Sequence, residues 1–236
     1  MGELSDQKAP AEGVIVTLAA LHPRRILGEV HGVAFRLTWT GFSELMDAAE
    51  GVTKKDFLQG PAGRRFKAPY SPSQTVLFLE EEEARWWFAF SSALAGAERS
   101  PRWAETWLKT RSLPPPWSLA FLERAEAEGF LNAKRYAARK LQAAQTRGGD
   151  PLWILKRKIS AEGGEVANET LKTFDETKAL LALIERRYPR EQDPAKLMSR
   201  LRLRGFSAGL IRRAMQIRFG SAPLPEPEME GTDPTP

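Results

Sequence analysis

Residues 129–158 read GFLNAKRYAARKLQAAQTRGGDPLWILKRK, and this stretch carries the signals that end one helix and begin two more. Gly129 stands where the preceding helix should end, because glycine adopts the left-handed closing conformation without a Cβ penalty. Asn132 is placed to cap the next helix. Leu131 and Tyr136 have the spacing of a hydrophobic staple around that cap.

The second helix of this stretch begins at Asp150-Pro151, a capping acceptor followed by the residue best tolerated at the first helical position. Asp150 is the only acid between Ala133 and Ser160. We therefore expect two helices with a cationic surface suited to an anionic partner. The basic residues of the segment are Lys134, Arg135, Arg139, Lys140, Arg147, Lys156, Arg157 and Lys158.

The composition indicates a soluble protein, with 42% hydrophobic and 28% charged residues among 236. This length allows one sizeable core or two small ones. No apolar run reaches the roughly 18 residues of a membrane span, and the amino terminus has no signal-peptide pattern. We therefore expect a cytoplasmic protein without membrane association. The absence of cysteine excludes disulfides, thiolate metal sites and a cysteine nucleophile.

Residues 13–59 are predicted to form a small β-rich module. The segment 26–30 and the segment 33–39 flank His31-Gly32, which has the length of a two-residue hairpin connection. The alternating apolar positions of the second segment predict that one face of this hairpin is buried. Those positions are Val33, Phe35, Leu37 and Trp39.

The rest of the chain is predicted to be helical from about Glu80, with three capping residues that each precede a proline. Ser100-Pro101, Asp150-Pro151 and Asp193-Pro194 lie roughly 50 and 43 residues apart, within the range of helical repeats. Apolar helices are predicted before and after each pair. This pattern predicts three units of three helices.

The third unit has the clearest signals. Gly205 is placed to end one helix, Ser207 to cap the next, and Phe206 and Ile211 to form a staple around that cap. From Pro194 to Phe219 there are seven basic residues and no acid. The chain then ends in a Pro-rich acidic segment that cannot build a core.

The predicted fold class is mainly α, with three tandem three-helix repeat units in an elongated curved array behind a small N-terminal β-hairpin-rich module. The predicted division is a disordered N-terminus (1–12), the β-rich module (13–59), a linker or loop (60–79), helical repeats at 80–131, 132–175 and 176–220, and a disordered acidic tail (221–236).

Two segments resemble the RecX family of bacterial recombination regulators. Residues 122–137, LERAEAEGFLNAKRYA, look like the family's unit junction, in which an apolar helix ends in Gly-aromatic-Leu before a basic-aromatic-Ala start. Residues 203–215, which begin Leu-Arg-Gly-Phe-Ser, are similar to its carboxyl-terminal unit. The similarity covers roughly residues 13–220 and is loosest in the first unit, where Pro114-Pro115-Pro116 interrupts the pattern.

The resemblance implies a regulator that binds the groove of the RecA filament on DNA and restrains filament extension, ATP hydrolysis and strand exchange. It implies no enzymatic activity and no cofactor, and we expect a monomer. The partner is the RecA filament, with single- or double-stranded DNA as a further candidate. The candidate contact residues are Lys134, Arg135, Arg139, Lys140, Lys156, Arg157, Lys158, Arg200, Arg202, Arg204, Arg212 and Arg213.

Two alternatives remain open at this point. A helical-repeat protein with these charges could bind DNA or RNA without RecA, or the charge could belong to a solvated surface of an interaction scaffold. The tryptophans are expected to lie in the cores of the repeat units rather than to stack on bases. These residues are Trp86, Trp87, Trp103, Trp107, Trp117 and Trp153.

Other candidate sites have weaker patterns. His22 and His31 have no acidic cluster at ligand spacing, so we expect no metal site. The acidic run Glu80 to Glu83 is predicted to be the solvated start of a helix. No Ser-His arrangement or phosphate-binding Gly-rich loop supports hydrolase chemistry.

Overall fold

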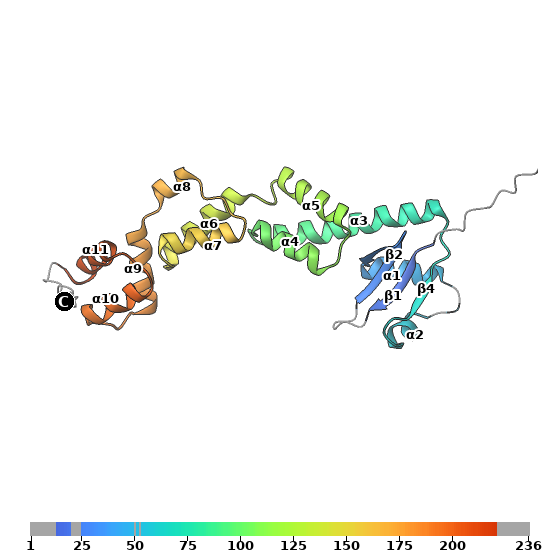
Figure 1. Ribbon diagram of the computed structural model, residues 1–236, viewed down its shortest axis with the longest axis horizontal. Coiled ribbons are helices and arrows are strands. Elements are labelled where there is room, and N and C mark those ends of the chain that lie inside the picture. Colours follow the sequence, from blue (N-terminus) through green and yellow to red (C-terminus); the bar gives the residue numbers. More distant parts are fainter. Residues whose placement is uncertain (1–12, 20–24, 50, 52, 221–236) are drawn as a thin grey trace, which may run out of the picture. The chain divides into compact units, whose positions relative to one another are not determined.

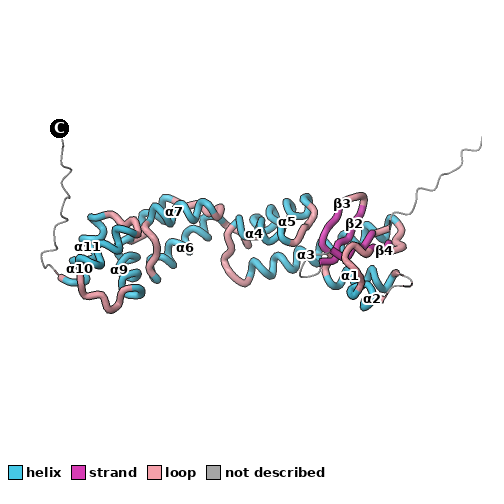
Figure 2. Tube along the Cα trace, turned by 60° about the horizontal axis from the view of Figure 1, so that its bottom comes forward, coloured by secondary structure: helices cyan, strands magenta, loops and turns pink. Residues whose placement is uncertain are grey.

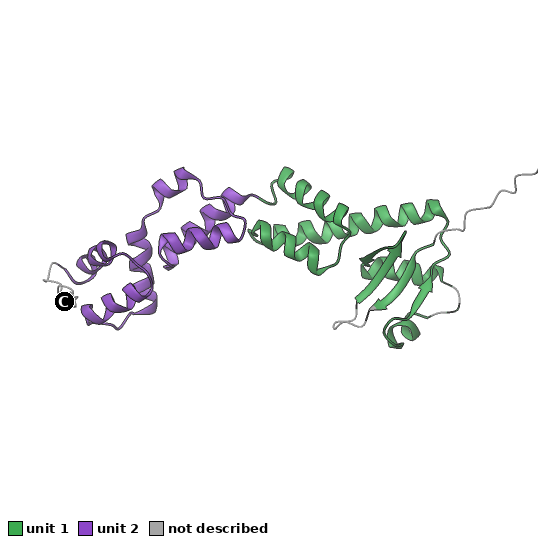
Figure 3. Ribbon diagram, viewed as in Figure 1, with its two compact units in different colours: residues 1–131 green, residues 132–236 purple. Residues whose placement is uncertain are grey.

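The computed structural model describes residues 13–19, 25–49, 51 and 53–220, and these form two compact units. Unit 1 comprises residues 1–131 and unit 2 residues 132–236 (Figure 3). The described chain is mainly helical, and a small antiparallel sheet precedes the helices. Three triplets of helices follow that sheet, as the sequence predicts (Figure 1). The predicted segments 1–12 and 221–236 lie outside the described residues.

Unit 1 begins with a four-stranded antiparallel sheet in the order β3-β2-β1-β4. Two of its helices, α1 and α2, pack with the sheet around one apolar cluster that includes Phe35, Phe42 and Phe57. The elements are β1 (Ile15–Ala19), β2 (Arg25–Val30), β3 (Val33–Arg36), α1 (Trp39–Ala48), α2 (Lys54–Gln59) and β4 (Arg65–Lys67).

The hairpin predicted at His31-Gly32 is confirmed. Val30 pairs with Val33, and both turn residues have positive φ, as a two-residue turn of type I′ requires. The strand is shorter than predicted, because Thr38 caps α1 by accepting a hydrogen bond from Gly41 N. Phe35 and Leu37 are buried as expected, but the prediction was wrong for Val33 and Trp39, which are 48% and 62% exposed. Trp39 belongs to the helix rather than to the strand.

The predicted linker at 60–79 instead contains β4 and the first two turns of α3 (Pro72–Ala95). Ser71 and Gln74 form a capping box, and Pro72 occupies the first turn. The helix therefore begins eight residues before Glu80. The prediction that the acidic run 80–83 is the solvated start of a helix was therefore wrong. The run lies inside α3, and Glu82 is fully buried.

The first helical triplet consists of α3, α4 (Pro101–Thr110) and α5 (Pro115–Ala127). The carboxyl-terminal half of α3 packs with α4 and α5 around Trp86, Phe90 and Phe121, while its amino-terminal half belongs to the core of the sheet. Proline in the first turn starts α5 at Pro115, earlier than the expected Leu119.

Unit 2 contains the other two triplets, which are visible in Figure 2. The second comprises α6 (Ala133–Arg147), α7 (Leu152–Ala161) and α8 (Asn168–Thr173), with Leu141 and Ile159 in its core. The third comprises α9 (Glu176–Arg187), α10 (Pro194–Leu203) and α11 (Ala208–Phe219), with a core around Leu180, Leu201 and Ile211. Helix α6 packs directly against α9.

Most of the predicted helix ends are confirmed. Ser100, Asn132, Asp193 and Ser207 each accept a backbone hydrogen bond in the first turn of their helices. The prediction that Asp150 caps α7 was wrong, since Asp150 makes no cap hydrogen bond. The Leu152 N–H at this end donates instead to Glu176 Oε1 at 2.9 Å.

Candidate cationic interface of unit 2

All twelve candidate contact residues lie in unit 2, on four helices and one helix cap. Ten of them are exposed, whereas Arg200 and Arg204 are half-buried. Helix α6 carries Lys134, Arg135, Arg139 and Lys140, helix α7 carries Lys156, Arg157 and Lys158, helix α10 with its cap carries Arg200, Arg202 and Arg204, and helix α11 carries Arg212 and Arg213.

Acids from outside the basic run partly neutralise α6. Lys134 Nζ lies 3.5 Å from a Glu165 carboxylate oxygen, and Lys140 Nζ lies 3.8 Å from Glu162. The Tyr136 hydroxyl also donates to Glu162. Tyr136 is buried, as expected. The surface of α6 therefore carries negative as well as positive charge, although its own sequence contains no acid. The two carboxylates come from the turn between α7 and α8.

Asp150 joins two of the predicted cations. Its carboxylate accepts hydrogen bonds from Lys158 Nζ at 2.6 Å and from Arg204 Nη2 at 3.4 Å. The hydrogen bond from Lys158, together with the charges of Lys158 and Arg204, lowers the pKa of the Asp150 carboxyl despite partial burial. The amino-terminal end of α7 is therefore fastened to the carboxyl-terminal cap of α10.

A second contact joins the beginning of α7 to the end of α10. The Trp153 indole N–H donates to the Gly205 carbonyl oxygen at 3.2 Å. The Arg157 guanidinium carbon lies 5.8 Å from the centroid of the Trp153 ring. We call Trp153, Lys156, Arg157, Lys158 and Arg204 the junction surface.

The expectation that Trp153 lies in a core was wrong, since its side chain is 56% exposed. Trp86 and Trp107 are buried as expected, and three others are half-buried against their cluster. Trp153, Lys156 and Arg157 have the i, i+3, i+4 spacing of one helix face, while Leu152, Leu155 and Ile159 pack in the core. This spacing is visible in the sequence and could have identified Trp153 as a surface residue.

The remaining cations have different surroundings. Arg200 forms an ion pair with Glu191 at 2.7 Å and lies 5.7 Å from the Tyr188 ring, at the turn between α9 and α10. Within the described part of the chain, Lys156, Arg202, Arg212 and Arg213 form no ion pair with any acid. Their charges are therefore the ones most available to an anionic partner.

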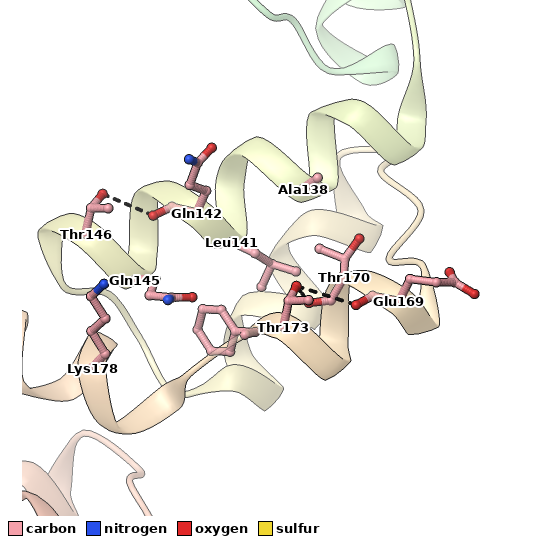
Figure 4. A pocket seen from close by; sticks show the side chains of 10 residues that line it. Ala138, Leu141, Gln142, Gln145, Thr146, Glu169, Thr170, Thr173 and Lys178 are labelled. Carbon is pink, nitrogen blue, oxygen red and sulfur yellow. Dashed lines mark hydrogen bonds between the residues drawn. The ribbon is translucent and has the colours of Figure 1, made fainter.

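A groove of about 580 Å³ lies between α6, α8 and the start of α9 and contains none of the twelve cations (Figure 4). Several of its polar side chains are satisfied by nearby backbone groups. The Thr146 hydroxyl donates to the Gln142 carbonyl oxygen at 3.0 Å, and Gln145 Oε1 accepts from Asp175 N at 3.2 Å.

The described ranges contain neither a metal-binding cluster nor a membrane-spanning helix. No group of three or more acidic or histidine residues there could hold a metal ion. No helix of the described chain is long and apolar enough to cross a membrane. His31 lies in the hairpin turn, and His22 lies outside the described residues.

No protein-family model and no curated protein matches the chain. The solved structures that are similar to it include two with a TM-score of 0.47 each. The crystal structure of RecX from Lactobacillus salivarius has 16% sequence identity over 58% of this chain and 97% of that chain. A crystal structure of the regulatory protein RecX has 14% identity over 87% of this chain and 99% of that chain.

Proposed function

We propose that the chain is a RecX-like regulator that binds the RecA filament on DNA through the cationic surface of unit 2. Binding would inhibit filament extension, ATP hydrolysis and strand exchange, without any chemical step on the regulator. A ligand of the filament acts in this way through its different affinities for the competing filament states.

The sequence resemblance of residues 122–137 and 203–215 supports this proposal. Both segments fold as helix–helix junctions, since Gly129 and Gly205 have φ values of +76° and +87° after their helices. Asn132 and Ser207 then cap the helices that follow. The residues that carry the resemblance therefore end one helix and begin the next in each segment.

The junction surface is the observation on which the proposal mainly rests. Asp150 accepts hydrogen bonds from Lys158 of α7 and from Arg204 at the cap of α10, so cations of the second and third triplets lie together, and the Trp153–Gly205 hydrogen bond joins the same two helices. Fixed cations lose less conformational freedom on binding than mobile ones, so such a surface suits a repetitive anionic partner. The acidic face of a protein filament and the phosphate backbone of its DNA both have this chemistry.

The test measures the single-strand-dependent ATP hydrolysis and the strand exchange of RecA with increasing amounts of the purified protein. We expect inhibition at stoichiometric ratios. Lys156→Glu/Arg157→Glu should raise the concentration for half-inhibition by about tenfold, because two attractive charges become repulsive. The matched control is Lys55→Glu/Arg65→Glu, which reverses two exposed cations of unit 1. No effect of the wild-type protein on RecA would reject the proposal.

The exposure of Trp153 beside Lys156 and Arg157 favours a second candidate, a nucleic-acid binder that acts without RecA. Exposed aromatic rings with neighbouring cations bind single strands by base stacking and charge. This candidate predicts binding to single-stranded DNA alone that weakens steeply with salt. Weak binding to naked DNA together with strong capture of RecA filaments would exclude it.

A further inference from the structure

Three arginines of unit 1 converge at the edge of the sheet. In the β2–β3 pair, Arg36 lies opposite Leu27. Arg25 precedes Leu27 by two residues and therefore projects from the same face of β2. Diagonal neighbours of this kind in an antiparallel pair lie about 7 to 8 Å apart, within reach of long side chains.

The third arginine comes from the end of α4, where Arg111 is the carboxyl-terminal cap. A backbone hydrogen bond brings this region to the edge strand β3, since Arg36 N donates to the Ser112 carbonyl oxygen at 3.4 Å. The indole of Trp86, on α3, donates to the Arg36 carbonyl oxygen at 3.0 Å. Ser112 has a φ of +53°, which is uncommon for a residue with a Cβ.

Arg111 is held firmly in its place. Its guanidinium carbon lies 3.5 Å from the centroid of the Trp107 ring, and Nη1 donates to the Trp107 carbonyl oxygen at 3.2 Å. The negative end of the α4 dipole favours a cation at this position. The helix dipole favours the charge of Arg111 alone, since Arg25 and Arg36 lie on strands.

The three charges repel one another, and within the described ranges none of them forms an ion pair with an acid. Burial and then the charge of Arg25 lower the pKa of the Arg36 guanidinium, while burial, Arg36 and Arg25 lower the pKa of Arg111. Glu29, the other diagonal neighbour of Arg36, forms no ion pair with it in the described part of the chain. All three side chains are half-buried, and within the described ranges the buried Arg25 Nε has no hydrogen-bond partner.

We propose that Arg25, Arg36 and Arg111 form a binding site for a phosphate group in unit 1. Guanidinium groups bind phosphate oxygens through paired, charge-assisted hydrogen bonds, and a phosphate would offset the mutual repulsion of three of them. The free hydrogen-bonding capacity of Arg25 and the fixed ring-stacked position of Arg111 suit such a ligand. This site lies outside the cationic surface of unit 2 and does not depend on the function proposed for that surface.

Arg36→Gln is the most informative variant, because the hydrogen bonds that Arg36 makes in the described chain come from its backbone N and O. The substitution removes the guanidinium and leaves those contacts in place. Arg111→Met is the second variant, since a Met side chain can still cover the Trp107 ring. The matched control is Arg65→Gln on β4, at the opposite edge of the same sheet. Circular dichroism checks that all variants fold.

Titration calorimetry of the full chain with inorganic pyrophosphate provides the first measurement. We expect saturable binding that Arg36→Gln and Arg111→Met each weaken by about tenfold, whereas Arg65→Gln changes it by less than about twofold. At the same concentration, pyrophosphate should also raise the unfolding temperature of the wild-type protein more than that of Arg36→Gln.

Fluorescence anisotropy with a labelled oligothymidine identifies the source of the phosphate. Competition between pyrophosphate and the oligonucleotide, lost in Arg36→Gln, would assign the site to a nucleic-acid backbone. Pyrophosphate binding that the oligonucleotide does not displace would assign it to a small phosphate compound. Absence of saturable pyrophosphate binding, or equal losses in Arg36→Gln and Arg65→Gln, would overturn the proposal.

Discussion

The backbone N–H of Thr38 donates to the Glu82 Oε2 atom at 2.8 Å, and this contact joins the first residues of α1 to the middle of α3. The Thr38 hydroxyl donates to the other carboxylate oxygen of Glu82, and Arg85 Nη1 donates to the same oxygen at 3.0 Å. Glu82 is fully buried, so these partners replace the water that a carboxylate would otherwise need. In unit 1 the sheet and the long helix are thus connected by a polar contact as well as by apolar packing.

This contact predicts that Glu82→Ala destabilises the protein by about 3 kcal/mol, because Thr38 and Arg85 would lose a buried partner. Urea denaturation of both proteins measures the effect. The control is Glu81→Ala, the neighbouring carboxylate, which pairs with Arg85 at 3.0 Å but is exposed. Its loss should cost less than about 1 kcal/mol. Equal effects of the two substitutions would contradict the structural role of Glu82.

The ion pairs of Asp150 predict a pH-dependent effect of Asp150→Asn. The pKa of this carboxyl is lowered from 3.8 in the folded state, so its contribution to stability is complete above that value and disappears as the pH falls through the lowered pKa. We expect a loss of about 1 kcal/mol at about pH 7 that shrinks as the pH is lowered below 3.8, measured by urea denaturation. Asp193→Asn is the control, since asparagine caps a helix as well as aspartate does. A loss that stays constant over this pH range would argue against the ion pairs.

The positions of most helices followed from local signals in the sequence. Caps such as Ser100, Asn132 and Ser207 satisfy amide groups of the residues directly after them, so their effect depends little on the rest of the fold. The capping box at Ser71 and Gln74 is equally local, and its recognition would have placed the start of α3 correctly.

The errors concern residues whose partners are distant in the sequence. Asp150 accepts a hydrogen bond from Arg204, 54 residues away. The Leu152 N–H, which Asp150 was expected to cap, donates to Glu176 instead. Trp153 is exposed, and its partner Gly205 is 52 residues away. The candidate phosphate site could not be predicted from sequence, because only the β2–β3 register and the end of α4 bring its arginines together.

Trp153→Ala tests whether the junction surface contacts bases. If single-stranded DNA stacks on this ring, the substitution should weaken binding by about tenfold, as measured by fluorescence anisotropy of a labelled oligonucleotide. Trp39→Ala is the matched control, since Trp39 is 62% exposed but lies in unit 1. Unchanged binding by the Trp153 variant would show that the ring takes no part, and equal losses in both variants would show that the effect is not specific to the junction surface.

Gly148→Ala should be the most damaging small substitution in unit 2. Gly148 ends α6 with a φ of +74°, and a Cβ built on it would lie 2.3 Å from both Leu183 Cα and Leu183 N in the backbone of α9. Because backbone atoms cannot rotate away, α6 and α9 would have to separate, and we expect a loss of more than about 3 kcal/mol.

Gly220→Ala separates this clash from the strain of the glycine conformation itself. Gly220 ends α11 with a φ of +79°, and no other atom of the described residues lies within 4 Å of the Cβ position. This variant should lose only the roughly 1 to 2 kcal/mol that a left-handed alanine costs. The difference between the two variants in urea denaturation therefore measures the close approach of α6 to α9, and equal losses would mean that these helices do not pack as closely as the structure shows.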